Sequence, residues 1–140
     1  MGQKTHPVGF RLQINKNWRS TWFAGDSFAN GLQEDVRIRK YLKARLPNAG
    51  ISRVEISRTS KIVTVTIFTA RPGIVIGKGG EEVTRLKAEV TQLTEKEVQI
   101  NISEIKRPEL DAALVGANIA HQLMKKLRSL SGLQDGVQIL

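Results

Sequence analysis

The chain has 140 residues, of which 22 are Lys or Arg and 13 are Asp or Glu, so its formal net charge is +9. This surplus attracts polyanions and favours a nucleic-acid partner over an anionic membrane. The absence of cysteine excludes a disulfide scaffold, a cysteine zinc site and a thiol nucleophile, and it fits a reducing compartment. No apolar run approaches the ~20 residues of a membrane span. The length fits one folded domain with an appendage.

Residues 1–25 are basic, contain no acidic residue and have poor periodicity. We predict an extended arm that needs a partner to become ordered. Trp18, Trp22 and Phe23 form an apolar cluster, which we interpret as a staple that packs the arm onto a core rather than a platform for stacking bases. The residues of this arm that we predict to contact RNA are Gln3, Lys4, His6, Arg11, Lys16 and Arg19.

Residues 34–46 are predicted to form a helix, because Ile38, Leu42 and Leu46 recur at helical spacing. We expect Glu34 and Asp35 to lie at its N-terminal end, where the helix dipole favours negative charge. The other faces are basic. They indicate either a solvated surface or a stripe that faces phosphates, made of Arg37, Arg39, Lys40, Lys43 and Arg45.

Residues 51–58 and 62–70 alternate apolar and polar side chains, so both are predicted strands. The three residues between them predict an antiparallel hairpin. Residues 97–103 return to the same alternation and predict a third strand. The preceding segment predicts a helix with one apolar stripe, made of Val83, Leu86, Val90 and Leu93. The fold class is therefore α+β, with a three-stranded mixed sheet packed by helices.

Residues 109–128 are predicted to form a further helix, in which small residues lie beside the apolar row. Lys125, Lys126 and Arg128 fall in its last turn, where they either complement the helix dipole or contact RNA. Residues 129–140 are predicted to be rich in turns, and GVQIL at 136–140 is typical of the start of a strand.

The segment RPGIVIGKGGEEV, residues 71–83, contains four glycines. A P-loop is excluded, because Gly73 lies too close to Gly77 and Gly79 stands where a P-loop has Ser or Thr. A dinucleotide-binding turn is excluded, because Glu82 replaces the last glycine and no strand directly precedes the turn. The remaining pattern is Gly-x-x-Gly between two helices.

Such a turn lets a nucleic-acid backbone approach without a Cβ in the way, beside the free N–H groups of the next helix. The residues predicted to contact RNA here are Arg71, Gly77, Lys78, Gly79 and Gly80. Glu81 and Glu82 would repel phosphate, so a purely structural turn stays open as the alternative.

The predicted order of helix, two strands, short helix, glycine turn, helix and strand resembles the second type of K-homology (KH) domain. Four motifs over roughly residues 1–124 resemble the bacterial or organellar ribosomal small-subunit protein three family. They are MGQKTHPVGFR at the start, WFAG and LQED within 22–35, TARPGIVIGKGG at 69–80 and PELDAALVGANIAHQL at 108–123.

The resemblance implies a structural protein that binds 16S-type rRNA in the head of the small subunit, near the path along which mRNA enters. It implies neighbouring small-subunit proteins ten and fourteen as partners, contact with mRNA, and a cytoplasmic or organellar ribosome as the location. It also implies a basic arm over 1–34, a KH domain over 35–106 and the start of a C-terminal domain over 107–140.

One departure from this family follows His121. Members carry an arginine-rich stretch after the corresponding helix, to which unwinding of mRNA structure is credited, whereas this chain passes through MKKLRSLSG to LQDGVQIL. Two explanations stay open: a truncated protein, or a sequence joined across a gap. The mRNA-unwinding role therefore stays open for this chain, while the rRNA-binding role carries over.

No pattern in the sequence indicates an enzyme or a cofactor. His6 and His121 are isolated histidines without a carboxylate or serine partner at catalytic or metal-binding spacing. We therefore expect no catalytic residue, no metal and no cofactor. The alternative to a ribosomal protein is a free-standing KH-type assembly factor or RNA chaperone, which would lack a long arm that rRNA orders.

Overall fold

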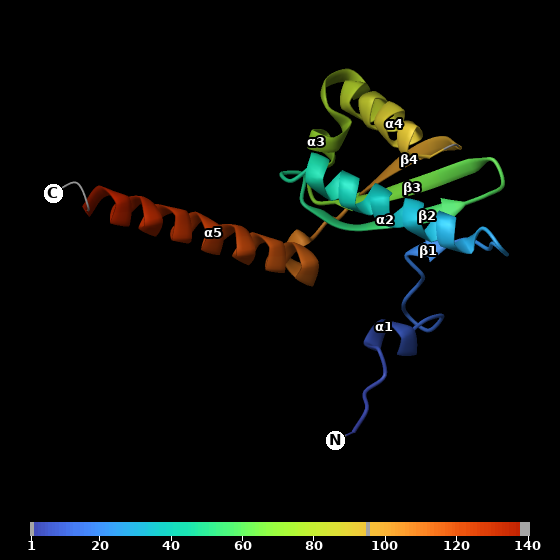
Figure 1. Ribbon diagram of the computed structural model, residues 1–140, viewed down its shortest axis with the longest axis horizontal. Coiled ribbons are helices and arrows are strands. Elements are labelled where there is room, and N and C mark those ends of the chain that lie inside the picture. The colour runs from blue at the N-terminus through green and yellow to red at the C-terminus, as the bar shows by residue number, and fades with distance from the viewer. Residues whose placement is uncertain (1, 95, 138–140) are drawn as a thin grey trace. The chain divides into compact units, whose positions relative to one another are not determined.

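The computed structural model describes residues 2–94 and 96–137, with side chains through residue 126. The chain divides into two compact units, one up to Glu104 and the other from Ile105 onward. The first unit contains, in order, α1 (Pro7–Phe10), β1 (Ser20–Thr21), α2 (Phe28–Arg45), β2 (Ile51–Arg58), β3 (Ile62–Thr69), α3 (Pro72–Ile76), α4 (Glu81–Leu93) and β4 (Glu97–Glu104). The second contains α5 (Ala112–Val137) after a 3₁₀ turn at Pro108–Leu110 (Figure 1).

The sheet has the strand order β1-β2-β3-β4. β2 and β3 are antiparallel, as the short link predicts, while β3 and β4 are parallel because two helices connect them. Facing pairs such as Val65 with Ile56 and with Ile100 bring the apolar residues of each strand to one face. The mixed sheet is thus confirmed, and the two-residue β1 adds a fourth strand, parallel to β2, that the alternation in the sequence did not show.

Three helices cover one face of this sheet (Figure 1). The core contains Ile38 and Leu42 from α2, Val75 from α3, and Leu86 and Val90 from α4, all at most 1% exposed. They pack on the strand residues Val54, Ile56, Val63, Val65, Ile67 and Val98. The helical stripes and the strand alternation therefore meet in a single apolar layer, which fixes the position of the turn between α3 and α4.

Helix α2 begins at Phe28, six residues before the predicted start at residue 34. The Trp22 ring packs against Phe28 at a centroid distance of 5.3 Å and also lies against Gly31. This tertiary contact extends the helix through Asn30 and Gly31, which are weak helix formers. The prediction that Glu34 and Asp35 lie at the N-terminal end of the helix is therefore wrong.

The arm is more structured than predicted. Residues of α1 form one helical turn, and β1 pairs with β2. The expected cluster of three aromatic residues does not form, because the Trp18 and Phe23 side chains are 62% and 98% exposed. Trp22 alone serves as the staple, since only its ring packs beneath the start of α2.

Helix α5 differs from the prediction at both ends. It begins at Ala112 rather than residue 109, because the Asp111 carboxylate accepts hydrogen bonds from the backbone N–H groups of Ala113 and Leu114. It runs on to Val137, so the predicted turns over 129–137 and the strand start at 136–137 are wrong. The segment continues an existing helix, and adding residues to a formed helix needs no new nucleus. Residues 138–140 lie outside the described part of the chain.

Candidate nucleic-acid interface

The turn between α3 and α4 is built from three glycines with positive φ. Gly77 ends α3 at φ 72° and ψ −176°, and its N–H group donates to the Gly73 carbonyl at 3.0 Å. A 3₁₀ turn, Lys78–Gly80, follows, in which φ is 63° at Gly79 and 83° at Gly80. Residues with a Cβ rarely adopt these angles, so the backbone of the turn depends on glycine.

The glycines differ in what surrounds them. A Cβ on Gly77 would lie 2.6 Å from Cγ of Glu82, so this position is closed to any side chain. A Cβ on Gly79 or Gly80 would meet no atom within 4 Å. The backbone of Gly79 and Gly80 is therefore open on the side where a Cβ would project, and a ligand can approach it closely.

The N-terminus of α4 has no side-chain cap. Gly80 is its N-cap residue, and no side chain accepts a hydrogen bond from the first N–H groups of the helix. Those groups, together with the helix dipole, favour an anion at this end. The Lys78 side chain is exposed at the tip of the turn. The arrangement can bind a phosphate through backbone N–H groups and one ammonium group.

The two acidic residues after the turn have different surroundings. The Glu82 carboxylate lies 3.5 Å from the Arg45 guanidinium and 3.6 Å from that of Arg85, whereas Glu81 is exposed. Arg45 also lies 3.6 Å from the carboxylate of Glu89. The two guanidinium groups offset the negative charge of Glu82, and this weakens its repulsion of a phosphate at the turn.

Helices α2 and α4 are joined by a second polar contact near Arg45. The Tyr41 hydroxyl donates a hydrogen bond to the Glu89 carboxylate. This bond, together with partial desolvation and the negative charge of Glu89, raises the pKa of Tyr41. The contact fixes α4 against α2 and thereby helps to hold the glycine turn in place.

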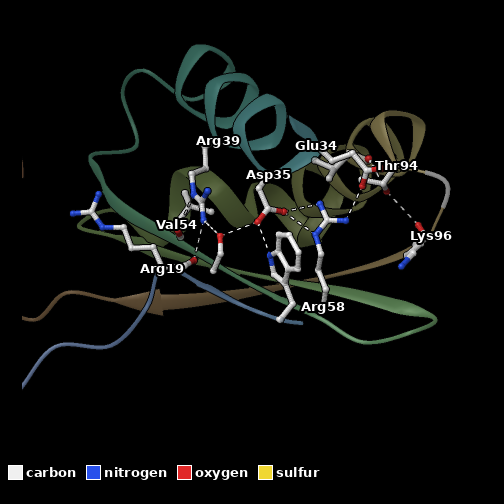
Figure 2. Close-up of polar contacts among 11 residues, drawn as sticks. Arg19, Glu34, Asp35, Arg39, Val54, Arg58, Thr94 and Lys96 are labelled. Atoms are coloured by element: carbon white, nitrogen blue, oxygen red, sulfur yellow. Dashed lines mark hydrogen bonds and ion pairs between the residues drawn. The ribbon is translucent and has the colours of Figure 1, made fainter. Parts of the chain in front are cut away.

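A buried carboxylate at the opposite edge of the sheet holds the arm (Figure 2). Asp35 of α2 is fully buried. Its Oδ2 accepts hydrogen bonds from the Ser20 hydroxyl at 2.8 Å and from the Trp22 indole N–H at 2.9 Å, and its Oδ1 accepts one from Arg58 Nε at 2.7 Å. One carboxylate therefore connects the arm, α2 and β2.

Two arginines complete this network. Arg58 also donates to Glu34 at 2.6 Å. Burial alone would lower the pKa of Arg58, but its bonds to Glu34 and Asp35 outweigh burial and raise the pKa. Arg39 donates from Nη2 to the Arg19 carbonyl at 2.9 Å and to the Ser20 hydroxyl at 2.5 Å. Burial lowers the pKa of Arg39, and Asp35 only partly opposes this effect.

Sequence reasoning missed this network, although one signal was present. Asp35 precedes Ile38 and Leu42 by three and seven residues, which places it on the buried face of the helix. The basic stripe predicted on α2 stays a prediction. Arg39 and Arg45 have partners within the protein, and Arg37, Lys40, Lys43 and Arg45 are exposed.

The remaining predicted contact residues lie in the arm, at the start of α3 and on α5. In the arm, His6 Nδ1 accepts a hydrogen bond from the Gly9 N–H at 3.4 Å, and Arg11 donates to the Pro7 carbonyl at 3.0 Å. The other exposed residues of this set are Gln3, Lys4, Lys16, Arg19, Arg71, Lys125 and Lys126. The Arg128 side chain lies outside the described residues.

Two exposed apolar side chains precede the turn. The sequence analysis did not assign them to a site. Ile74 is 42% exposed and Ile76 41% exposed, although both belong to the short α3.

In residues 2–94 and 96–126, no cluster of three or more metal-ligating side chains occurs. None of the helices described here is long and apolar enough to cross a membrane.

The sequence profile of the KH domain family matches residues 37–110. The small ribosomal subunit protein uS3 of Cytophaga hutchinsonii is 58% identical over 137 residues, which cover 98% of this chain and 54% of that protein. The proteins of the same name from Flavobacterium johnsoniae and Phocaeicola vulgatus are 58% and 54% identical over 127 residues, covering 91% of this chain and 50% and 52% of theirs. The chain spans about half the length of these relatives. It therefore belongs to the KH domain family and is a homologue of the small ribosomal subunit protein uS3.

Proposed function

We propose that this chain is a structural, non-catalytic component of the small ribosomal subunit and that it binds the rRNA of that subunit. The observation that carries the proposal is the identity of 58% to a uS3 protein over 98% of the chain. The net charge of +9 and the open glycine turn give this role a physical basis, because rRNA is a polyanion whose backbone such a turn can hold.

In this proposal the turn binds one stretch of single-stranded RNA. Phosphates lie against the N–H groups at the start of α4 and against Lys78, where Gly79 and Gly80 leave room for the backbone. The exposed Ile74 and Ile76 supply an apolar surface beside the turn, on which a base can pack. Phosphates thus provide affinity, and the apolar contact excludes water.

The finer parts of the proposal come from the resemblance to ribosomal small-subunit protein three. They are a position in the head of the subunit near the path of incoming mRNA, contact with mRNA, and contact with small-subunit proteins ten and fourteen. The location is a cytoplasmic or organellar ribosome. Lys125 and Lys126 on α5 are exposed cations suited to such contacts.

Sedimentation tests the ribosomal role. A tagged copy of the chain is produced in bacterial cells, and the lysate is separated on a sucrose gradient after nuclease treatment that removes mRNA. We expect the chain to sediment with the small subunit and to stay there in moderate salt. Recovery only in the light fractions would contradict the proposal.

Substitution at the turn tests the site. The variant Lys78→Asp with Gly79→Asp places negative charge at the turn, and aspartate tolerates the left-handed φ of position 79 better than most residues. We expect rRNA affinity to fall by more than roughly tenfold. The control is Lys87→Gln, which removes an exposed charge from α4 further along the helix. An unchanged affinity in the folded double variant would make the turn purely structural.

Truncation tests the arm. Deletion of residues 2–17 removes Lys4, Arg11 and Lys16 but keeps Arg19 to Trp22, which are anchored to the sheet. If each of the three cations contacts one phosphate, the slope of log affinity against log salt falls by roughly 2 units. An unchanged slope, measured by filter binding, would show that this part of the arm contacts no phosphate.

A further inference from the structure

A second basic surface lies at the edge of the sheet opposite to the glycine turn. It is a groove of about 180 Å³ between α2 and β2, and Arg19 of the arm contributes to its lining. Five cationic side chains line it and no acidic one does: Arg19, Arg39, Lys40, Lys43 and Arg53. The volume exceeds the ~30 Å³ share of one water several times, so the groove has room for an anion of several atoms.

Three elements of the fold bring these cations together. Lys40 and Lys43 lie three residues apart on α2, which places them on one side of the helix. Arg53 comes from β2, and its guanidinium lies 3.9 Å from the centroid of the Phe68 ring. Arg19 enters through the arm, whose carbonyl at this residue accepts a hydrogen bond from the Ile56 N–H at 2.9 Å. The docked arm therefore completes the groove.

The charges within the groove are poorly compensated by the protein. Arg39 donates to two carbonyls and a hydroxyl, all neutral acceptors. The nearest carboxylate, Asp35, already accepts bonds from Ser20, Trp22 and Arg58. Only Arg53 has an ion pair, with Glu55 at 2.9 Å, and both partners are substantially exposed. Burial lowers the pKa of Arg39, the charge of Asp35 opposes this in part, and the charges of Arg19 and Arg58 lower the pKa further. An anion in the groove would offset this excess of positive charge.

We propose that this groove binds a phosphate group of the RNA backbone, as a second contact separate from the glycine turn. The inference rests on the proposed rRNA-binding function and adds a site to it. Guanidinium groups hold phosphate oxygens through paired N–H donors, and lysines add mobile charge. β1 and β4 are the two edge strands of the sheet. Helices α3 and α4 lie against β4, whereas the arm lies at β1. The two contacts therefore bind different parts of the RNA.

The first experiment compares two double variants that lose the same charge. Lys40→Gln with Lys43→Gln changes the groove, and Lys61→Gln with Lys87→Gln changes two exposed lysines outside it. All four side chains are exposed, so both variants should fold, which thermal melting verifies. Filter binding to small-subunit rRNA is measured over a range of salt concentrations.

We expect the groove variant to lower the log–log slope by about 0.7–0.9, the value for one lost phosphate contact. The control should lower it by less than about half a unit. Equal slopes in the two variants would overturn the inference while the wild-type chain still binds rRNA. Failure of the proposed function is a different result, in which the wild-type chain neither binds rRNA nor sediments with the small subunit.

The second experiment identifies the anion. The Nε–Hε resonances of Arg39 and Arg53 are followed by NMR while inorganic phosphate, a short single-stranded RNA or polyglutamate is added to the 140-residue chain. Saturable shifts with phosphate and with RNA support a phosphate site of general use. Shifts with RNA alone support a site for the phosphodiester backbone. Shifts as large with polyglutamate as with RNA would overturn the assignment and indicate an acidic protein partner.

Discussion

The β1–β2 edge of the KH sheet and the turn between α3 and α4 use their polar groups in opposite ways. At the β1–β2 edge, the fully buried Asp35 carboxylate accepts hydrogen bonds from three side chains of the arm and β2, so these groups are used within the protein. At the turn between α3 and α4, the first N–H groups of α4 have no side-chain cap and the glycine backbone is open. The basic residues therefore differ in role: Arg58 holds the fold together through two carboxylates, whereas Lys78 is exposed and available to a ligand.

The largest effect should come from Asp35→Ala, which removes the acceptor at the centre of the β1–β2 edge. Arg58 would keep only Glu34, and the Ser20 hydroxyl and Trp22 indole would lose their shared partner. Removing one member of a buried ion pair costs about 3–5 kcal/mol. Urea unfolding measures this loss. The double variant Asp35→Leu with Arg58→Leu should recover part of it, and a single variant as stable as the wild type would refute the central role of Asp35.

The next effect belongs to the other edge, where Gly77→Ala should destabilise the fold by about 3 kcal/mol. The conformation of Gly77 is nearly exclusive to glycine, and the added Cβ would collide with Glu82. Gly79→Ala is the matched control, because its φ is also positive but its surroundings are open, and it should cost only about 1–2 kcal/mol. Equal losses of unfolding free energy would show that backbone strain alone, without the contact to Glu82, determines the turn.

A smaller effect separates the two tryptophans of the arm. Trp22→Phe keeps an aromatic ring against Phe28 but removes the N–H donor to Asp35, which should cost about 1.5 kcal/mol. Trp18→Phe should leave stability unchanged within about 0.5 kcal/mol, because Trp18 is 62% exposed. Each variant retains one tryptophan, so fluorescence follows unfolding in both. A loss on Trp18→Phe as large as that on Trp22→Phe would contradict the assignment of Trp22 as the sole staple.

The sequence predicts those parts of the fold whose signal is local. The alternation over 51–58 and 62–70 and the apolar stripe from Val83 to Leu93 define strands and a helix that the structure contains almost residue for residue. The spacing of Gly77 and Gly80 likewise locates the turn, because glycine adopts a positive φ without a steric penalty. These features depend on near neighbours in the chain.

The features that escaped prediction depend on distant residues. Asp35 accepts hydrogen bonds from Ser20 and Arg58, which are 15 and 23 residues away in the sequence. The local pattern therefore predicted a position at the end of a helix for Asp35. The true start of α2 depends on the packing of Trp22 against Phe28. Arg39 and Arg45 looked like surface cations because neither the Arg19 carbonyl nor Glu82 is near them in sequence. Which cations remain for RNA is therefore a property of the tertiary structure.

The smallest expected effect lies at Arg45, the cation that shields the glycine turn. Arg45→Gln breaks two partly exposed ion pairs, so the free energy of unfolding should fall by less than about 1 kcal/mol. The variant leaves the Glu82 carboxylate with Arg85 alone, at 3.6 Å, and so strengthens its repulsion of a phosphate bound at the turn. We expect rRNA affinity to fall roughly twofold, which corresponds to about 0.4 kcal/mol.

Glu82→Gln separates this shielding from a direct contact between Arg45 and RNA. Without the carboxylate there is no charge to shield, so affinity should rise above the wild type, and adding Arg45→Gln to Glu82→Gln should then have no further effect on binding. If the second substitution still lowers affinity by the same factor, Arg45 contacts RNA itself. It would then belong with the available cations of the glycine-turn edge rather than with those that hold the fold together.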